Sequence, residues 1–491
     1  MTVWDKIAGL AKDVLGDAAP TPQHFPALEN AIIPEQGQRQ DKTFTSYQPP
    51  LEGIEVLPEY DFILQALQAG CPSIFVTGKA GTGKSTLIQW LCQQLQGCAV
   101  VAPTAVAAVN AHGDTIHSFF GLPPSHIDPD GNFIVQEKKR MVLENVRYLI
   151  VDEVSMVLPN IVDAMSTILK KVRRNNIPFG GVPTIFIGDL LQLPPVVDSE
   201  ELAVFFTHRY KTPYFFSADI FQDQQVIPVH LTKVRRQSDA EFIAALNHIR
   251  LQDDDCRDAV ALLNRSCFRD KLKDAPKGIY LVPTNAAAKT INTRELDALP
   301  GELHLYEAKI TGEIPVNKWK LPVSDRLELK VGAQVIFLKN NKPHWINGDT
   351  GEVVGLEADH IRVKIHKGDN VVVVGKETWH KLKYTYNHAL KKIEQEPVGT
   401  FEQFPLALGW AITIHKSQGL TLEHLTLDLG GGAFASGQLY VALSRAKSLA
   451  GITLVKPIAM KDVKADPVVL EFYRLMGLND ADKPSSSGID S

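Results

Sequence analysis

The first half of the chain alternates short apolar segments with stretches in which apolar residues recur at helical spacing. Four apolar segments have the length of strands and are followed by Gly, Pro, Asp or Thr: 74–76, 99–101, 148–151 and 184–187. Strands that alternate with helices in this way are typical of a parallel α/β sheet. Ligands bind such sheets at the carboxyl ends of the strands, and the polar motifs of this chain follow those ends. The pattern therefore predicts an α/β fold with a site along one sheet edge.

The second half repeats the α/β pattern, but a β-rich stretch interrupts it. An α/β block begins near Val226, continues through 279–285 and resumes at Leu406. Between its two parts, apolar runs are separated by Gly, Asn and Asp turns, which indicates strands of a small β-barrel. The predicted organisation is an arm or linker at 1–50, a first α/β domain at 51–225, a second at 226–302 and 404–478, a β-rich accessory insertion at 303–403 and a flexible tail at 479–491.

Composition narrows the class of protein. The 491 residues are too many for one hydrophobic core, because domains average roughly 150 residues. The net charge of −5 does not indicate a nucleic-acid binder, so any DNA must be held in a local groove. The five cysteines form no CxxC pair, and no apolar run approaches the roughly 18 residues of a membrane span. We therefore expect a soluble intracellular protein without a membrane partner, cytoplasmic in a prokaryote, with nucleus and mitochondrion left open otherwise.

The N-terminal segment, residues 1–17, is amphipathic at helical spacing. Its acidic residues Asp5 and Asp13 distinguish it from a transit peptide, which is poor in acids. The segment either packs against the rest of the protein or binds a protein partner. Packing is the first expectation, since an amphipathic helix usually buries its apolar face within its own chain.

A P-loop follows the first apolar strand. Its sequence, GKAGTGKS at 78–85, supplies glycines that let backbone N–H groups surround phosphates at the N-terminus of a helix. Lys84 is expected to reach the β and γ phosphates of ATP, and Ser85 to bind Mg²⁺. The alternative is an ordinary glycine-rich turn, but a strand precedes the motif and a helical pattern follows it. The predicted ATP-binding residues here are Gly78, Ala80, Gly81, Thr82, Gly83, Lys84, Ser85 and Thr86.

Acidic and amide side chains follow the next two strands of the first domain. Asp152 is expected to hold the hydrated Mg²⁺, and Glu153 to polarise the attacking water. Two acids at a strand end are by themselves more often solvated than catalytic. Their occurrence together with a P-loop makes the catalytic role the better interpretation. Gln192, in GDLLQLPP, has an amide that can contact both the γ phosphate and water. Its alternative is an ordinary turn residue.

Two arginines far beyond the P-loop in the chain are candidates to stabilise the negative charge of the transition state. Phosphoryl transfer commonly uses an arginine finger, and Arg236 in VRRQ and Arg445 in ALSRA would provide it from the second domain. Each arginine alone is more often a solvated or salt-bridged surface residue. The predicted catalytic residues are Lys84, Asp152, Glu153, Gln192, Arg236 and Arg445, with Ser85 and Asp152 as metal ligands.

Eight motifs occur in one order along the chain: GKAGTGKS, APTAVAAVN, TIHSFF, DEVSM, GDLLQLPPV, RRQ, TIHKSQG and YVALSRA. This series resembles the Pif-type helicases of superfamily 1B, a group related to RecD, over roughly 51–455. Residues 163–174 also resemble the signature helix of that family, with a basic face that either is solvated or contacts DNA. The resemblance implies two RecA-like domains, a small SH3-like β-barrel inserted in the second, and a strand-separating wedge near 122–133 in the first.

The resemblance further implies an ATP-dependent DNA helicase that moves 5′ to 3′ on single-stranded DNA and unwinds duplex or structured DNA. ATP and Mg²⁺ would be its cofactors, and single-stranded DNA and junctions of single and double strands its partners. Gln418 and Gly419 would join the ATP site between the two domains. The residues implied to lie along single-stranded DNA are Thr104, His117, Phe119, Thr413, His415 and Lys416. Rings can stack on bases, and hydroxyls and cations can hold phosphates, although either Phe119 or Phe120 is expected to be core.

Two other functions share parts of this pattern. One is a RecD-like motor subunit of a recombination or repair nuclease complex, although the motor and the insertion leave no room for a nuclease domain. The other is a catalytically silent protein that binds single-stranded DNA, against which the intact Lys84, Glu153 and Arg445 argue.

One position departs from the pattern of the family. Its members usually carry a glutamine ahead of the P-loop that reads the adenine, where this chain has LPEYD at 57–61. Tyr60 could stack on the base instead, or Gln65 could reach it. Recognition of the phosphates is therefore better supported than recognition of the base.

Overall fold

The computed structural model describes residues 55–478, except 124–126, 198, 224–225, 238, 270–277, 313–320, 322, 340, 342–343, 346, 367–369 and 388–391. The predicted arm at 1–50, the candidate partner helix at 1–17 and the tail at 479–491 lie outside the described residues. None of the described helices combines the length and the apolar character that crossing a membrane would require.

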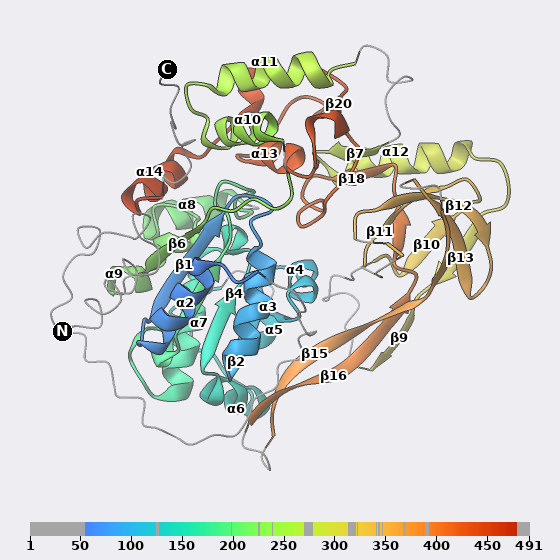
Figure 1. The fold of residues 1–491 in the computed structure, drawn as a ribbon. Coiled ribbons are helices and arrows are strands. Elements are labelled where there is room, and N and C mark those ends of the chain that lie inside the picture. Colours follow the sequence, from blue (N-terminus) through green and yellow to red (C-terminus); the bar gives the residue numbers. More distant parts are fainter. Residues whose placement is uncertain are drawn as a thin grey trace.

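A parallel six-stranded sheet organises residues 55–231, which we call the first lobe (Figure 1). The strand order is β3-β2-β4-β5-β1-β6. The strands are β1 (Ser73–Gly78), β2 (Cys98–Ala102), β3 (Asp114–Thr115), β4 (Tyr148–Val151), β5 (Thr184–Ile187) and β6 (Ile227–Leu231). The helices of this lobe are α2 (Pro58–Gln68), α3 (Lys84–Gln94), α4 (Ala105–Asn110), α5 (Ile116–Phe120), α6 (Glu137–Asn145), α7 (Pro159–Arg173), α8 (Glu200–Arg209) and α9 (Ile220–Asp223).

Helices cover both faces of this sheet. Phe75 and Phe186 pack with α5, α6 and α7, whereas Ile74 and Ile185 pack with α2 and α3 on the opposite face. Successive residues of a strand point to opposite faces, so two helical layers explain why the inner strands are apolar throughout. The sheet edge that carries the motifs is thereby held by a core on each side.

The boundary between the lobes differs from the one predicted at 225/226. Strand β6 pairs in parallel with β1, in a register that places Val76 opposite Val229. Residues 227–231 therefore complete the first sheet, and the prediction that they open the second domain was wrong. A short apolar strand looks the same whichever of two parallel sheets it joins, which is why the pattern misassigned it.

The second lobe, residues 232–302 and 409–463, is built on a parallel sheet with strand order β18-β7-β19-β20. Its strands are β7 (Ile279–Val282), β18 (Ala411–Thr413), β19 (Leu425–Leu427) and β20 (Ile452–Leu454). Its helices are α10 (Ala240–Leu251), α11 (Cys256–Cys267), α12 (Asn285–Ala298) and α13 (Gln438–Leu443). One core joins α10, α11 and α13 to the strands, and it also includes Ala80 of the P-loop and Leu193 of the first lobe.

An antiparallel β insertion separates the two parts of the second lobe. Its strands are β8 (His304–Glu307), β9 (Lys309–Gly312), β10 (Arg326–Leu329), β11 (Gln334–Phe337), β12 (Thr350–Leu356), β13 (His360–Ile365), β14 (Val371–Gly375), β15 (Glu377–Asn387), β16 (Lys392–Gln403) and β17 (Leu406–Leu408). Strand β17 pairs with β11, so the insertion ends at Leu408 and not at the predicted residue 403. The β-rich character agrees with the prediction, and an SH3-like barrel stays a prediction.

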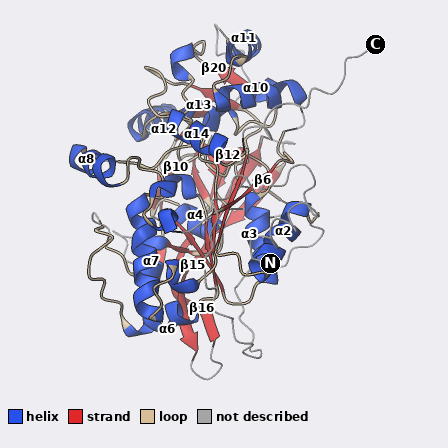
Figure 2. Cartoon of the chain, turned by 90° about the vertical axis from the view of Figure 1, so that its left-hand side faces the viewer, coloured by secondary structure: helices blue, strands red, loops and turns tan. Residues whose placement is uncertain are grey.

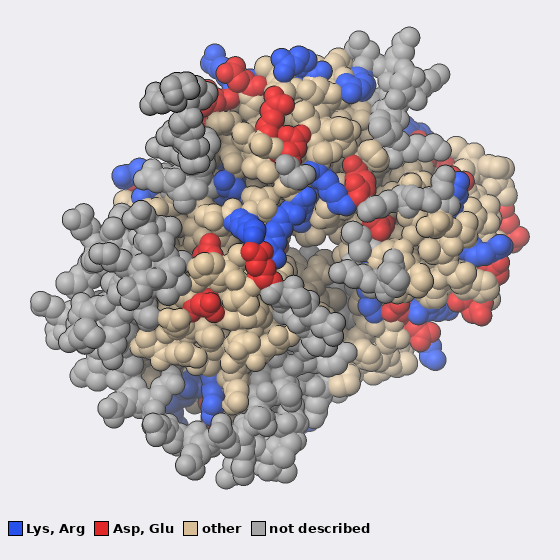
Figure 3. Space-filling model, in the orientation of Figure 1, with Lys and Arg blue, Asp and Glu red and all other residues tan. Residues whose placement is uncertain are grey.

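The insertion reaches back to the first lobe. The long hairpin of β15 and β16 extends away from the other strands of the insertion and meets α6, in both views of the molecule (Figures 1 and 2). Val109 of α4 also packs against a cluster of the insertion that consists of Val323, Trp379 and Phe401. Figure 3 shows an opening between the two lobes and the insertion.

The last described helix, α14 (Pro467–Leu475), returns to the first lobe. Phe472 stacks on Phe216 with ring centroids 4.1 Å apart, and Tyr473 is buried in the core that contains Phe75. The predicted second domain ran to residue 478, whereas these residues pack on the first lobe. An amphipathic helix shows that it has an apolar face but not which domain covers that face.

Candidate nucleotide and DNA site

The P-loop joins the end of β1 to the first turn of α3. Gly81 and Gly83 have φ angles of 83° and 89°, in the left-handed region that favours glycine. A Cβ on Gly78 would lie 2.7 Å from the Oγ1 of Thr82, so this position has no room for a side chain. The glycines thus allow the loop to curl over the N-terminus of α3, where free N–H groups attract anions.

Lys84 lies within the curve of this loop. Its Nζ donates to the carbonyl oxygens of Gly78 at 2.7 Å and Lys79 at 3.1 Å. Burial lowers the pKa of Lys84, although Asp189 and Glu153 oppose that shift. A cation that is removed from water and held mainly by neutral carbonyls is well placed to bind a phosphate.

The next two predicted residues follow in the first turn of α3. Ser85 is exposed and Thr86 is half-buried, and both belong to the first turn of α3, directly after the P-loop glycines. Thr82 is buried, and its Oγ1 donates to the carbonyl of Lys79 at 3.0 Å. The structure therefore gathers all the predicted P-loop residues around the start of one helix.

Backbone groups of the P-loop also bond to residues beyond the first lobe. The N–H of Ala80 donates to the hydroxyl of Tyr440 on α13 at 3.0 Å, and the N–H of Arg235 donates to the carbonyl of Gly81 at 2.9 Å. The phosphate loop therefore lies at the interface of the two lobes. Tyr440 was not predicted as a site residue, because in the sequence it belongs to an apolar helical segment and looks like an ordinary core residue.

Two carboxylates lie at the carboxyl end of β4. Asp152 accepts a hydrogen bond from the N–H of Glu153 at 2.8 Å, and Glu153 has a φ of 49°. That left-handed conformation is strained for a residue with a side chain, and such strain is concentrated at functional sites. Burial and the neighbouring Glu153 raise the pKa of Asp152 to about 7. Burial also raises the pKa of Glu153, against the effects of Lys84 and Arg445.

Gln192 lies in the loop after β5, at the interface between the lobes. Its Nε2 donates to the Oδ2 of Asp189 at 3.3 Å. A Cβ on Gly437, which precedes α13, would lie 2.3 Å from the carbonyl oxygen of Gln192, so the second lobe abuts this loop. Asp189 in turn pairs with Arg250 of α10 at 2.9 Å, and neither residue was predicted as part of the site. Their 61-residue separation leaves no local signal in the sequence.

Arg236 approaches the P-loop from the second lobe. A Cβ on Gly81 would lie 2.5 Å from the Cβ of Arg236. The Nη1 of Arg236 donates to the carbonyl of Ser444 at 3.2 Å. The adjacent Gln237 donates to the carbonyls of Ser444 at 3.1 Å and Ala446 at 2.9 Å. Gln237, which was not predicted, therefore fixes the backbone on both sides of the second candidate arginine.

That second arginine, Arg445, is only 2% exposed. Its guanidinium donates to the carbonyls of Val441 at 2.9 Å and Ser417 at 3.4 Å and to the Oγ of Ser444 at 2.8 Å. These acceptors are neutral, and no ion pair of the described chain includes Arg445. Burial and the nearby Arg236 lower its pKa to about 9.

Gln418 and Gly419 lie in the turn after β18. The Nε2 of Gln418 is buried and has no hydrogen-bond partner among the described residues, which is unfavourable for an amide unless a ligand supplies one. A Cβ on Gly419 would lie 3.9 Å from the Nδ2 of Asn110 on α4, so this turn faces the first lobe. The position agrees with the predicted place between the domains, and contact with nucleotide stays a prediction.

Two of the predicted DNA-binding threonines cap local structure. The Oγ1 of Thr104 accepts from the N–H of Ala107 at 3.2 Å at the N-terminus of α4. The Oγ1 of Thr413 accepts from the N–H of Lys416 at 3.2 Å. Thr104 follows β2 of the first lobe, whereas Thr413 is the last residue of β18 in the second lobe and is buried. Both hydroxyls keep a hydrogen to donate, and contact with DNA stays a prediction for both.

The predicted cation and imidazoles lie close to these threonines in the chain. His117 in α5 and His415 after β18 are half-buried, and burial lowers the pKa of both rings. Lys416 is exposed. Neutral imidazoles can stack on bases or donate to phosphates, so both histidines retain their predicted role as candidates.

Two predicted aromatic contacts do not agree with the structure. Phe119 is 4% exposed and packs edge-on against Phe120 in the core of the first lobe, so the prediction that its ring lies along DNA was wrong. Tyr60 is also fully buried, with its ring against Trp90 and its hydroxyl donating to the carbonyl of Gly83 at 3.1 Å. It supports the P-loop from inside and is not free to stack on adenine. Gln65, on α2, stays a candidate.

A P-loop at the edge of a parallel sheet, with arginines arriving from a second α/β lobe, defines a two-lobed P-loop nucleotide-binding protein. Comparison with known proteins specifies the family. Residues 59–254 match the family model described as PIF1-like helicase. The chain is 32% identical to the ATP-dependent DNA helicase Pif1 of Bdellovibrio bacteriovorus, over 87% of this chain and 93% of that protein. It is 35% identical to human ATP-dependent DNA helicase PIF1, over 84% of this chain and 62% of the human protein.

Solved structures agree with the sequence comparison. A Pif1 helicase from Bacteroides superposes with a TM-score of 0.81 at 34% identity, over 88% of this chain and 99% of that one. Bacteroides Pif1 in complex with ADP-AlF4 gives 0.80 at 34% identity, over 87% and 98%, and Bacteroides Pif1 bound to ssDNA gives 0.63 at 35%, over 86% and 97%. The chain therefore belongs to the PIF1-like helicase family, although it spans less than two thirds of the human relative.

Proposed function

We propose that this chain is a DNA-stimulated ATPase that moves 5′ to 3′ along single-stranded DNA and separates duplex or structured DNA ahead of it. Membership of the family supports the ATP-dependent helicase activity, and the structures of Bacteroides Pif1 in complex with ADP-AlF4 and bound to ssDNA support these ligands. A solved structure of two coordinating Pif1 helicases, which concerns DNA unwinding at forked dsDNA, supports a duplex substrate. The direction follows from the likeness to superfamily 1B helicases.

One observation carries the proposal most directly. Arg445 is buried at the lobe interface, and its partners are neutral. A buried guanidinium without an ion-pair partner is unfavourable, and burial and the nearby Arg236 lower its pKa against the effects of Tyr440, Glu153 and Asp189. The γ phosphate of ATP on the P-loop would add negative charge at this position, and it would draw the second lobe onto the first.

In this proposal the groups around the P-loop divide the work of hydrolysis. Glu153 polarises a water whose oxygen attacks the γ phosphorus, while the bond from that phosphorus to the β–γ bridging oxygen breaks, which yields ADP and phosphate. Lys84, Arg236 and Arg445 stabilise the negative charge that spreads over the phosphoryl oxygens. Gln192 orients the water and senses the γ phosphate. The intact catalytic set argues against a catalytically silent binding protein.

Mg²⁺ fits the oxygen ligands at this edge. Ser85 and Asp152 would hold it, since Mg²⁺ prefers hydroxyl and carboxylate oxygens and is usually bound through few protein ligands, water and substrate phosphates. Burial and Glu153 raise the pKa of Asp152 to about 7, and a bound cation would favour its charged form. When bound, the ion neutralises charge on the phosphates.

The proposed DNA path crosses both lobes. Thr104 and His117 would contact it on the first lobe, and Thr413, His415 and Lys416 on the second. We propose that the DNA lies in the opening between the lobes and the insertion that Figure 3 shows. We propose that the insertion is an SH3-like accessory domain over the DNA.

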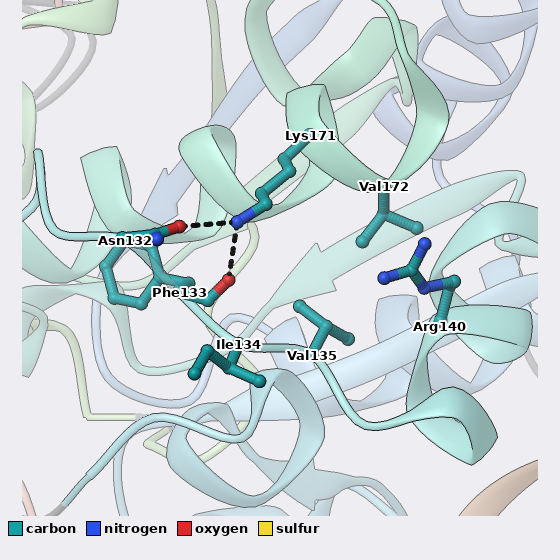
Figure 4. Close-up of a pocket in the computed structure, with 7 residues that line it drawn as sticks. All are labelled: Asn132, Phe133, Ile134, Val135, Arg140, Lys171 and Val172. Atoms are coloured by element: carbon teal, nitrogen blue, oxygen red, sulfur yellow. Dashed lines mark hydrogen bonds between the residues drawn. The ribbon is translucent and has the colours of Figure 1, made fainter.

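The segment at 122–133 is proposed as the strand-separating wedge, and its described residues are held firmly to the first lobe. Lys171 of α7 donates to Asn132 Oδ1 at 2.7 Å and to the carbonyl of Phe133 at 2.9 Å (Figure 4). Asn160 of the same helix donates to the carbonyl of Ile127 at 2.8 Å. The neighbouring Ile134 is 91% exposed. An exposed apolar residue next to a segment fixed to the lobe would suit strand separation.

The test is unwinding of duplexes that carry a single-stranded tail at either the 5′ or the 3′ end. We expect ATP-dependent strand separation from the 5′ tail alone. A motor that moves 5′ to 3′ reaches the duplex only when it starts on a single-stranded tail at the 5′ side of that duplex. Lys84→Ala should bind single-stranded DNA within about 3-fold of wild type but unwind neither duplex, since ATP hydrolysis is lost. Unwinding from the 3′ tail alone would overturn the proposed direction.

A further inference from the structure

Asp189 is a buried carboxylate whose hydrogen bond to a predicted site residue is the one from Gln192, and it also acts electrostatically on Lys84. It lies two residues beyond β5 and is 1% exposed. Its Oδ2 accepts from the Nε2 of Gln192 at 3.3 Å, and its Oδ1 accepts from the N–H of Leu191 at 3.2 Å. The carboxylate thus fixes both the side chain of Gln192 and the backbone that precedes it.

The partner of Asp189 comes from the other lobe. Arg250, at the end of α10, directs its Nη2 to Asp189 Oδ1 at 2.9 Å and its Nε to Asp189 Oδ2 at 3.4 Å. Both side chains are fully buried, and α10 packs in the core of the second lobe. Burial tends to raise the pKa of Asp189, but Arg250 and Lys84 outweigh it, so the pKa lies below its ordinary value. The ion pair therefore joins the two lobes.

A third element contacts the same carboxylate. The hydroxyl of Tyr473, on α14, accepts from the N–H of Leu190 at 3.0 Å and lies 3.5 Å from Asp189 Oδ1. It also lies 2.7 Å from the Oγ1 of Thr77, the residue before the first P-loop glycine. The guanidinium of Arg250 lies 5.6 Å from the centre of the Tyr473 ring. One hydroxyl therefore bridges the strand that leads into the P-loop and the loop that carries Gln192.

We propose that Arg250 and Tyr473 are positioning residues, which set the amide of Gln192 through the Asp189 carboxylate and transmit movement of the second lobe to it. The inference rests on the proposed role of Gln192 at the γ phosphate. Because Arg250 moves with α10, closure of the lobes changes where Asp189 holds Gln192. Tyr473 limits that movement, since its hydroxyl ties the same loop to the end of β1. Neither residue touches the predicted phosphate site itself.

The chain offers a matched pair of variants for the test. Tyr473→Phe removes one hydroxyl from the network and keeps the ring in the core. Tyr214→Phe removes another hydroxyl that involves α14, because the hydroxyl of Tyr214 donates to Asp466, the N-cap of that helix, at 2.7 Å. Both variants weaken the attachment of α14, but only Tyr473 contacts the Asp189 loop. Arg250→Ala is less suitable, since a buried carboxylate without its partner endangers folding.

The readout is the kcat and KM for ATP, measured with saturating single-stranded DNA. We expect Tyr473→Phe to lower kcat about 5- to 20-fold with KM changed less than about 2-fold, and Tyr214→Phe to change both less than about 2-fold. Thermal unfolding should place the two variants within a few degrees of each other. Equal effects of the two substitutions on kcat would overturn the proposal, because Tyr473 would then act only by attaching α14.

A double-mutant cycle tests whether Tyr473 acts through Gln192. In a Gln192→Ala background, we expect Tyr473→Phe to lower single-turnover hydrolysis less than about 2-fold further, since residues that act through one another are not additive. A further loss as large as in wild type would contradict the inference. The Gln192→Ala single variant distinguishes failure of the proposed function from failure of the positioning inference. If Gln192→Ala alone leaves hydrolysis unchanged, the proposed role of Gln192 fails. If Gln192→Ala abolishes it while Tyr473→Phe behaves like Tyr214→Phe, only the positioning inference fails.

Discussion

At the scale of single residues, several polar groups on the sides of the two lobes that face each other lack suitable protein partners. Arg445 has neutral acceptors, Gln418 Nε2 has no partner among the described residues, and Asp152 has a raised pKa beside a second carboxylate. Each is unfavourable in the protein alone, because buried polar and charged groups normally find partners of opposite character. A ligand with both negative phosphates and a bound cation would satisfy these groups together.

The raised pKa of Asp152 makes a prediction about stability. An acid whose pKa is higher in the folded than in the unfolded chain destabilises the fold progressively as the pH rises from about 4 to about 7. Asp152→Asn should therefore stabilise the nucleotide-free protein at pH 8, by on the order of 1–3 kcal/mol because the group is only half-buried. The advantage should shrink below pH 7, and ATP turnover should be lost.

Thermal unfolding of both proteins at pH 8 and pH 5.5, without nucleotide, measures this effect. Asp254→Asn, an exposed change of the same kind on the second lobe, is the control and should shift the midpoint little at either pH. A destabilised Asp152→Asn protein at pH 8 would show that the carboxylate is stabilised by the fold and contradict this interpretation.

Residues in local motifs were predictable from the sequence because spacing alone places them. Gly78 to Thr86 follow a strand and begin a helix, and the structure gathers them as that context requires. Asp189, Arg250 and Tyr473 were not predicted, since Tyr473 lies 284 residues beyond its partner Asp189. Phe119 was wrongly predicted to lie along DNA, because an aromatic residue near a motif has the same pattern whether it packs inward or stacks on a base.

At the scale of elements, α14 shows how a segment outside both sheets can matter to the site. Its Phe472 ring stacks on Phe216 and lies 5.9 Å from Phe75 of β1, and the next residue, Tyr473, reaches the loop of Asp189. The aromatic contacts hold the helix, and the helix places the hydroxyl. Docking of α14 is therefore a condition for the network around Gln192.

We predict that Phe472→Ala loosens this docking. Loss of this aromatic ring should lower the free energy of unfolding of the first lobe by about 2–3 kcal/mol. Truncation of a fully buried aromatic ring costs more, and Phe472 is only half-buried. Val468→Ala, on an exposed position of the same helix, is the control and should change stability by less than about 0.5 kcal/mol. Urea unfolding followed by tryptophan fluorescence measures both. An unchanged midpoint for Phe472→Ala would show that α14 contributes little to the lobe.

Element boundaries were less predictable than the elements themselves. The strands at 74–76, 148–151 and 184–187 fall within β1, β4 and β5, because a buried parallel strand is a short apolar run. The boundary strands β6 and β17 were assigned to the wrong neighbours, since pairing depends on residues far away in the chain. The partner sheet is a property of the tertiary structure.

At the scale of the whole molecule, two lobes and an insertion surround the proposed ligands. Their arrangement is more similar to unliganded Bacteroides Pif1, with a TM-score of 0.78, than to Bacteroides Pif1 bound to ssDNA, with 0.63, at the same 35% identity. The two lobes already meet at the P-loop through Tyr440, Arg236 and the Asp189–Arg250 pair. We therefore propose that nucleotide binding acts on the rest of the molecule through the contacts at that interface.

The central claim is that ATP is hydrolysed between the lobes, with Arg445 supplying charge from the second. DNA-stimulated hydrolysis by Arg445→Ala tests it most directly, with Arg265→Ala on an exposed position of α11 as the matched control. We predict that Arg445→Ala lowers kcat about 10²- to 10³-fold with a small change in KM, while Arg265→Ala equals wild type. If a folded Arg445→Ala protein hydrolysed ATP at the wild-type rate, the two-lobe active site would be contradicted.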